Sequence, residues 1–443
     1  MAPAPLLVRR ACVLTMNDAF DIIEGDVLIE DGRIRSVGGT IVPPPGAMMI
    51  DAAGDYLLPG FVQTHIHLCQ TLFRGYADDR ALLDWLRTRI LPMEAAHTPA
   101  SLRAATGLAA AELLQGGTTS VLTMETVHDT DAVFEALEPT GLRAVVGKCM
   151  MDADPAAPSR LREQTQASID ESLAIARRWH GRAGGRLRAA LAPRFAVSCS
   201  RDLLEAVAQL SRTHGLLVHT HASENRDEVA LVRQRTGLAN IAYLAELGLV
   251  DQHVCLAHCV WVDEGERRLL AERRAHVLHC PGSNLKLGSG IAPVVELRQL
   301  GVSLSLGADG AACNNHLDMF QEMRLAATLQ AVRSGPGTLP AREVVAIATR
   351  GGAYALGLAQ EIGQVTTGFR ADLILVRSDR PHQTPAPDPY ATLVYATQPT
   401  DVRTAIVDGE LLVHEGTLTR WETGELVSRA RAEAKALAVR AFG

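Results

Sequence analysis

Two histidines, separated by one residue, end an apolar run near the start of the chain. The run begins after Pro59-Gly60 and ends at His65 and His67. An apolar run after a turn predicts a buried strand, and side chains at positions i and i+2 of a strand point to the same side. The two imidazoles can therefore reach one metal ion together. Taken alone, the pair also fits strand-end histidines that pack through hydrogen bonds.

The composition of the 443-residue chain restricts its partners and its compartment. The net charge is −7 and the 43 Lys and Arg residues are spread along the chain, so we expect neither nucleic acid nor an anionic membrane as a partner. The 8 cysteines form no CxxC pair and indicate reduced thiols. We find no signal-like start and no apolar run of spanning length, and therefore predict a cytoplasmic location.

The middle of the chain alternates strand-like runs with amphipathic helical segments. Each parallel strand needs a crossover helix, so eight such units predict an α/β chain with a (β/α)8 barrel. The strand-like runs are 61–67, 118–124, 142–150, 187–193, 216–222, 254–259, 275–281 and 302–309. The helical segments include 101–115, 161–179, 201–213, 264–274 and 317–333.

Short β-type runs separated by turn residues occupy both ends of the chain. The break at Glu30-Asp31-Gly32 between two alternating runs predicts a hairpin. We predict one small β-sandwich built from both termini, with its first part in residues 1–58 and its second part, with a C-terminal helix, in residues 361–443. The catalytic barrel would then occupy residues 59–360.

Chemically active side chains recur at the predicted strand ends, where barrels carry their active sites. His65 and His67 end the first run. His221 ends the fifth, His258 the sixth and Asp309 the eighth. Three or four imidazoles with one carboxylate form a plausible ligand set for one divalent ion, zinc most readily and ferrous iron as an alternative.

Three of these positions suggest separate roles. Glu224 follows His221 by three residues and can carry the proton of a metal-activated water, although a surface cap or salt bridge is the alternative. Asp309 can bind the metal and also take a proton. His258 can be a ligand or can donate a hydrogen bond to the reacting group.

Two further observations concern the number of metal ions. His219 has the same strand parity as His221 but lies one layer deeper, so we expect a hydrogen-bonded core histidine. The run 187–193 contains no lysine that could be carboxylated to bridge two metals, which favours a single ion.

Several motifs closely resemble the amidohydrolase superfamily, in particular its mononuclear deaminase branch. They are PGFVQTHIHLCQT, VHTHASE, LAHCVW, HCPGSNLKLGSGIAP and LGADGAACNN. That branch includes deaminases of methylthioadenosine and S-adenosylhomocysteine, of 5'-deoxyadenosine and of guanine, and s-triazine hydrolases. The resemblance implies hydrolytic release of ammonia from a carbon that bears an exocyclic amine.

The resemblance also implies roles for individual residues. It places the metal on His65, His67, His221 and Asp309. It makes Glu224 the proton shuttle, and it moves His258 from a possible ligand to the group that polarises the reaction centre.

Substrate contacts are implied at three more positions. By resemblance to adenosine-type deaminases, Trp85 lies near the nucleoside and Glu94 binds ribose hydroxyls, whereas a core tryptophan and a helix-face charge are the alternatives. Lys148 stands where those enzymes often carry an arginine, so we expect it to contact the 5' substituent differently.

Arg194 departs from the adenosine-type pattern, which has histidine after the corresponding proline. The arginine and Gln70 together resemble guanine deaminase, and arginine can donate to a carbonyl oxygen but cannot accept from an amine. We expect a small heterocyclic substrate, an adenosine-type nucleoside with a modified 5' position. Guanine or another oxopurine base, or an s-triazine that loses an amino or chloro group, is the alternative.

A non-catalytic scaffold is disfavoured because every candidate ligand and Glu224 are present. Barrels of this kind often pair through their helices, so by analogy we expect a homo-oligomer.

Overall fold

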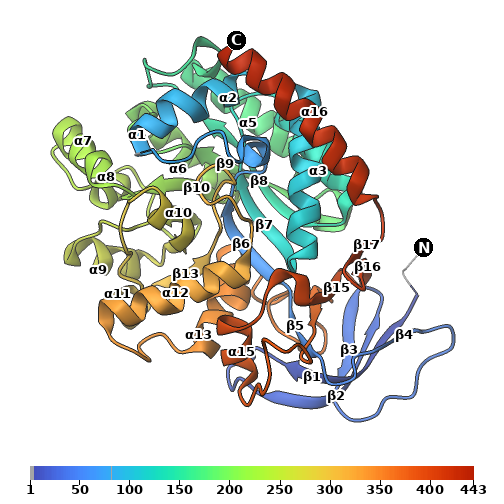
Figure 1. Cartoon of the computed structure of the whole chain (residues 1–443). Helices are drawn as coiled ribbons and strands as arrows, with labels where there is room; N and C mark the ends of the chain where they lie inside the picture. The colour runs from blue at the N-terminus through green and yellow to red at the C-terminus, as the bar shows by residue number, and fades with distance from the viewer. Residues whose placement is uncertain (1–3, 81) are drawn as a thin grey trace.

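Eight parallel strands form a barrel in the middle of the chain (Figure 1). The structure is a computed structural model that describes residues 4–80 and 82–443. The barrel strands are β6 (Phe61–Ile66), β7 (Thr118–Met124), β8 (Arg143–Met150), β9 (Leu187–Pro193), β10 (Val218–Ala222), β11 (Val254–His258), β12 (His276–His279) and β13 (Ser303–Leu306). They pair in chain order, which confirms the predicted α/β barrel.

The first and last strands of the barrel meet through polar contacts. Thr64 Oγ1 lies 2.7 Å from Ser305 Oγ, and the Asp309 N–H donates to the His65 carbonyl oxygen at 3.0 Å. A Cβ at Gly307 would come within 2.5 Å of that carbonyl oxygen, so only glycine allows this approach. The closure brings the end of the eighth unit beside the end of the first.

Helices cover the outside of the barrel. The predicted helical segments correspond to α3 (Pro99–Gln115), α5 (Thr165–Trp179), α6 (Arg201–His214), α9 (Glu264–Arg273) and α12 (Met319–Ser334). Further helices are α4 (Thr130–Leu137), α7 (Arg226–Thr236), α8 (Asn240–Glu246), α10 (Pro281–Lys286), α11 (Val294–Gln299), α13 (Ala341–Ala346) and α15 (Pro389–Tyr395). Among the described residues, four short helical segments lie between β6 and α3: η1 (Leu68–Phe73), α1 (Leu82–Trp85), η2 (Leu86–Ile90) and α2 (Leu91–Ala95).

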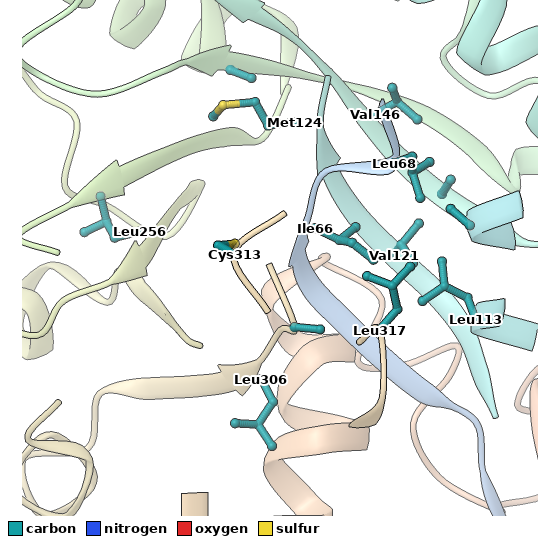
Figure 2. Close-up of a cluster of buried hydrophobic side chains, with 14 of the residues drawn as sticks. Ile66, Leu68, Leu113, Val121, Met124, Val146, Leu256, Leu306, Cys313 and Leu317 are labelled. Carbon is teal, nitrogen blue, oxygen red and sulfur yellow. The ribbon is translucent and has the colours of Figure 1, made fainter. Parts of the chain in front are cut away.

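Apolar side chains fill the layer between strands and helices. Ile66 of β6, Val121 of β7 and Leu113 of α3 belong to one buried cluster, in which they lie close together (Figure 2). Burial of these side chains is the main favourable contribution to folding. It holds the strand ends, and therefore the side chains they carry, in fixed positions.

The two ends of the chain build a second, mixed sheet. Its nine strands are β1 (Leu6–Leu14), β2 (Ile22–Glu30), β3 (Arg33–Val37), β4 (Met48–Asp51), β5 (Tyr56–Pro59), β14 (Leu373–Val376), β15 (Val402–Val407), β16 (Glu410–His414) and β17 (Thr417–Leu418). The amino-terminal and carboxy-terminal strands meet where β5 pairs antiparallel with β14. The predicted β unit from both termini is therefore confirmed, whereas its residue limits of 1–58 and 361–443 stay predictions.

The predicted hairpin is present in this sheet. Glu30 pairs with Arg33, and the two residues between them, Asp31 and Gly32, have φ values of 50° and 76°. Positive φ at both central residues is the geometry of the tight hairpin turn that the aspartate-glycine pair favours.

The last helix, α16 (Thr423–Phe442), lies along the outside of the barrel beside α3 (Figure 1). Its Arg440 donates to the carbonyl oxygen of Ala96 at 2.9 Å. Within the part of the chain that the structure describes, no helix is both long enough and apolar enough to cross a lipid bilayer.

Candidate active site

Two histidines and an aspartate converge at the barrel mouth. The Nε2 atoms of His65 and His67 lie 3.3 Å and 3.1 Å from the same oxygen, Oδ1 of Asp309. His221 brings its Nε2 to 3.4 Å from Nε2 of His67. The structure therefore brings together the four predicted metal ligands, which come from strands one, five and eight.

Backbone carbonyl oxygens orient two of these rings. Nδ1 of His67 lies 2.7 Å from the Met124 oxygen, and Nδ1 of His221 lies 2.7 Å from the Arg194 oxygen. A carbonyl only accepts, so each Nδ1 must carry a hydrogen, and Nε2 is the nitrogen that can bind a metal when the ring is neutral. Such bonds on the far nitrogen are typical of metal-binding histidines.

The His65 ring is anchored by the deeper histidine. Nδ1 of His65 lies 2.7 Å from Nε2 of His219, and both side chains are fully buried. His219 is thus a hydrogen-bonded core residue, as expected. Burial lowers the pKa of His65 to about 4 and that of His221 well below its usual value. Both rings are therefore neutral at pH 7, the form that binds metals.

Asp309 is held as an anion. Its Oδ2 accepts a hydrogen bond from Ser283 Oγ at 2.7 Å. Burial alone would raise the pKa of Asp309, but the adjacent His65 and His67 rings hold it well below its usual range. The carboxylate is thus available as a metal ligand at neutral pH.

Glu224 and His258 face each other at the same mouth. His258 Nε2 lies 3.6 Å from Glu224 Oε2 and 3.9 Å from Asp309 Oδ2. Its Nδ1 lies 2.9 Å from Oδ1 of Asn284, which fixes the ring. Burial raises the pKa of Glu224 to about 7, so the carboxyl can both take and release a proton near neutral pH.

The backbone is strained at three of these loops. Ser223, His258 and Asp309 have φ values of 53°, 73° and 63°, a region that residues other than glycine rarely adopt. Strained residues of this kind cluster at functional sites, where the surrounding structure holds them in place.

The donor set fits a divalent transition metal. His65, His67 and Asp309 offer three ligand atoms within 4.8 Å of one another, and so do His65, His221 and His258. The Nε2 atoms of His65 and His258 are buried, and neither makes a hydrogen bond within the described residues. Buried ring nitrogens without partners at such a convergence indicate space for a ligand or an ion.

A cavity opens directly above these residues. Its lining includes Gln70, Trp85 and Arg194, three of the five predicted substrate contacts. It is lined by His67, Gln70, Leu82, Leu83, Trp85, Leu86, Arg194, Phe195, His221, Glu224, Glu228, Leu287 and Asp309. The leucines and Trp85 give it one apolar wall, which suits a flat heterocycle.

Glu94 lies behind this cavity in a buried ion pair. Its Oε2 accepts from Arg194 Nη1 at 2.7 Å, and its Oε1 accepts from Arg194 Nη2 at 3.2 Å and from Gln70 Nε2 at 3.0 Å. Burial opposes ionisation, but Arg194 holds the pKa of Glu94 below its usual value. Because a carboxylate only accepts, the Gln70 amide nitrogen must face Glu94. The Gln70 carbonyl oxygen is left buried without a hydrogen-bond partner in the described structure.

Lys148 is not among the residues that line the cavity. Its Nζ donates to Glu163 Oε1 at 2.6 Å, and the side chain is buried. The neighbour Cys149 lies near Arg194, with 3.8 Å between Sγ and Nη1. Alternation along β8 accounts for this placement, since Cys149 faces the site and Lys148 faces the opposite way.

The structure also brings in residues that the sequence analysis did not select. Phe195 and the leucines of the wall carry no chemical signature, so nothing in their type indicated a site. Glu228 lines the cavity, and Glu125 and Glu322 lie buried nearby. A usable signal existed for Glu125, because it directly follows the predicted strand run 118–124.

A parallel β/α barrel with imidazoles and a carboxylate at its strand ends defines a barrel enzyme with a candidate metal centre. The chain belongs to the amidohydrolase family, whose family model matches residues 56–412.

Individual relatives resemble the chain over almost its whole length. It is 41% identical to a 5'-deoxyadenosine deaminase of Methanothermobacter thermautotrophicus, over 95% of this chain and 96% of the relative. It is 40% identical to a 5-methylthioadenosine/S-adenosylhomocysteine deaminase of Symbiobacterium thermophilum, over 98% and 99% of the two chains. Among solved structures, an adenosine deaminase from Xanthomonas campestris with bound zinc superposes with a TM-score of 0.90, at 31% identity and 99% coverage of both chains.

Proposed function

We propose that this protein is a metal-dependent hydrolytic deaminase of adenosine-type nucleosides with a modified 5' position. The substrates would be 5'-deoxyadenosine, methylthioadenosine or S-adenosylhomocysteine, and the product besides the oxopurine nucleoside would be ammonia. The observation that carries the proposal is the convergence of His65, His67, His221 and Asp309 beside Glu224 under one cavity. The near full-length similarity to deaminases of these nucleosides supports it.

One divalent ion, zinc or alternatively ferrous iron, would be held by His65, His67, His221 and Asp309. When bound, it would supply Lewis-acid activation of water at neutral pH. The zinc in the similar adenosine deaminase structure supports zinc as the first choice.

The chain's own residues would move the protons. Glu224 takes a proton from the attacking water and delivers it to the amine that leaves, so that the carbon–nitrogen bond breaks and ammonia departs. His258 points its Nε2 at the space beside Glu224 and contacts the reacting group. The apolar wall around Trp85 holds the ring and limits the access of bulk water.

Two residues that line the cavity, Gln70 and Trp85, would supply the substrate contacts. The Gln70 carbonyl oxygen and the indole Nε1 of Trp85 are both buried and have no hydrogen-bond partner within the described residues. A ligand that presents one donor and one acceptor would satisfy both groups. Glu94, paired with Arg194, would act through these neighbours, and a contact from Lys148 would require the 5' substituent to reach beyond the cavity lining.

A second candidate is deamination of guanine or another oxopurine base. Gln70 and Arg194 both line the cavity, which favours it. The guanidinium of Arg194 already donates twice to Glu94, which weakens a direct contact from Arg194 to a carbonyl oxygen.

A substrate panel separates the two candidates. Zinc-loaded protein is incubated with 5'-deoxyadenosine, methylthioadenosine, S-adenosylhomocysteine and guanine, and ammonia and ultraviolet absorbance are followed. We expect turnover of at least one nucleoside with a higher kcat/KM than that for guanine. Turnover of guanine alone would replace the first candidate with the second. The homo-oligomeric state and the cytoplasmic location stay predictions. Size-exclusion chromatography with light scattering tests the oligomeric state.

A further inference from the structure

Three buried carboxylates surround the site without a cationic partner among the described residues. Glu125, Glu228 and Glu322 are each at most 1% exposed. Burying a carboxylate without a counterion is costly unless hydrogen bonds compensate. Most of the compensating donors lie in segments that follow barrel strands, and Thr123 of β7 and Asn240 of α8 supply two more.

Glu125 holds the loop that follows His67. Its Oε1 accepts from the Leu68 N–H at 3.2 Å, and its Oε2 accepts from the Cys69 N–H at 2.9 Å. These are the first two donors of η1, which also carries Gln70, and the first donors of a helix have no partner within it. The preceding carbonyl oxygen, that of Met124, accepts from the His67 ring. The end of β7 therefore fixes His67 through both its ring and its loop.

Glu228 holds the loop that carries Glu224. Its Oε2 accepts from the backbone N–H of Glu224 at 2.8 Å, and its Oε1 accepts from that of Ser223 at 3.2 Å. Asn240 donates its amide to the same Oε1 at 2.6 Å. The backbone on both sides of the strained Ser223 is thus bound to one side chain from α7.

Glu322 joins the loops after the seventh and eighth strands. It accepts from the Gly282 N–H at 2.9 Å and from Nδ2 of Asn314 at 2.8 Å. A Cβ at Gly282 would come within 2.4 Å of Glu322 Oε1, so glycine permits the contact. The next residue, Ser283, donates to Asp309, so Glu322 positions a hydrogen-bond partner of a candidate metal ligand.

We propose that Glu125, Glu228 and Glu322 are positioning residues that hold the metal-binding and proton-transferring side chains through the backbone of their loops. This inference rests on the proposed function, because each glutamate positions a residue with a proposed role. Glu125 positions His67 and Gln70. Glu228 positions Glu224, and Glu322 positions Asp309. None of the three needs to contact the substrate's reacting atoms for this role.

Replacement by glutamine tests the role with little change in volume. A carboxylate offers two accepting oxygens, whereas an amide offers one and points its NH2 group at a donor, which is a backbone N–H or, for Glu322, either a backbone N–H or the Asn314 amide. Each variant therefore loses one bond to its loop and gains a repulsive contact.

Glu266 provides a matched control. It is also buried and accepts from two backbone N–H groups, those of Ile241 at 2.8 Å and Asp263 at 3.0 Å. It holds the starts of α8 and α9, and it does not line the cavity. Glu266→Gln removes the same type of interaction from a carboxylate that contacts neither a proposed metal ligand nor Glu224.

The experiment compares four variants by zinc affinity, kcat, KM and melting temperature. For Glu125→Gln and Glu322→Gln we expect zinc affinity to fall about 10-fold to 100-fold, the usual effect of losing a group that orients a ligand. For Glu228→Gln we expect unchanged zinc affinity and a kcat lower by about 10-fold to 100-fold, with a shifted pH profile. Glu266→Gln should lower the melting temperature as the others do and leave zinc affinity and kcat/KM unchanged.

Two results would overturn the proposal. In the first, the variants of Glu125, Glu228 and Glu322 change only the melting temperature. In the second, Glu266→Gln loses as much zinc affinity and kcat as those three variants do. A site variant that does not fold counts as purely structural and removes that residue from the assignment. Zinc affinity is measured without substrate, so it tests the roles of Glu125 and Glu322 even when no nucleoside is turned over. The absence of nucleoside turnover would contradict the proposed function but not these two positioning roles.

Discussion

Glu224 and His221 lie only three residues apart but serve different parts of the site. His221 directs Nε2 toward His67 and is fixed by a backbone carbonyl oxygen, whereas Glu224 faces His258. Metal binding and proton transfer can therefore be removed separately by single substitutions.

Glu224→Gln should keep zinc and lose turnover, because an amide cannot carry the proton. We expect kcat to fall by about 10²-fold to 10⁴-fold, the usual contribution of a general acid or base. His221→Ala should lose both zinc and turnover. Metal analysis and ammonia release measure the two effects, with Glu246→Gln as the control, since Glu246 is half-exposed on α8. Near-normal kcat in Glu224→Gln would show that another group moves the proton.

For individual residues, the sequence indicated the candidate metal ligands but not all the side-chain contacts around them. His65, His67, His221 and Asp309 could be found because each ends a predicted strand. The ion pair of Glu94 with Arg194 could not be found, because the two residues are far apart in the chain and no local pattern joins them. Alternation along the strand could have predicted that Lys148 and its neighbour Cys149 point to opposite sides. Cys149 faces the site, so Lys148 points away from it.

Among the elements, the barrel strands were the most predictable. β7 and β9 coincide with the predicted runs 118–124 and 187–193, because a pair of glycines marks the start of each run. The short β12 and β13 end two to three residues before their predicted runs do. There the chain leaves the ladder to form the loops that carry Ser283 and Asp309, and tertiary contacts such as the one with Glu322 determine that departure.

The C-terminal helix is stabilised by a few buried side chains, which gives a prediction for this element. Leu437 of α16 is fully buried, whereas Val439 on the same helix is 64% exposed. Leu437→Ala should lower the free energy of unfolding by about 2–5 kcal/mol through lost burial and a cavity. Val439→Ala should change it by less than about 0.5 kcal/mol. Urea denaturation measures both, and equal effects would mean that α16 does not pack on the barrel.

On the scale of the whole molecule, a buried ion network joins the barrel to the terminal sheet. Arg143 at the start of β8 donates to Asp372 at 2.7 Å and 3.0 Å, and to Asp408 at 2.7 Å. Both aspartates belong to the carboxy-terminal part of the sheet region. One guanidinium therefore binds carboxylates of the sheet region from the barrel.

Arg143→Met should destabilise the protein strongly, because it leaves Asp372 without its buried partner and Asp408 with Arg370 alone. We expect a loss of about 3–5 kcal/mol in the free energy of unfolding. Arg103, half-exposed in a surface pair with Glu135, is the control, and Arg103→Met should cost less than about 1 kcal/mol. A similar small loss in both variants would show that the network does not link the two units.

The same network predicts a dependence of stability on pH. Burial opposes ionisation of Asp408, but Arg143 and Arg370 hold its pKa below the usual value of 3.8. A lowered native pKa stabilises the fold above the unfolded pKa, and this contribution is lost as the pH falls through the native value. Urea midpoints from about pH 5 to about pH 3 should therefore fall more in the wild type than in Arg143→Met. Parallel curves would exclude this contribution.

The central claim is that one metal ion at the barrel mouth enables deamination of an adenosine-type nucleoside. The most direct measurement titrates zinc into chelator-stripped protein and follows the initial rate of 5'-deoxyadenosine deamination by ultraviolet absorbance. We predict no activity in the stripped protein, a linear rise to one zinc per chain and a plateau beyond it. Full activity without metal, or no turnover of any nucleoside in a panel where guanine is deaminated, would contradict the account.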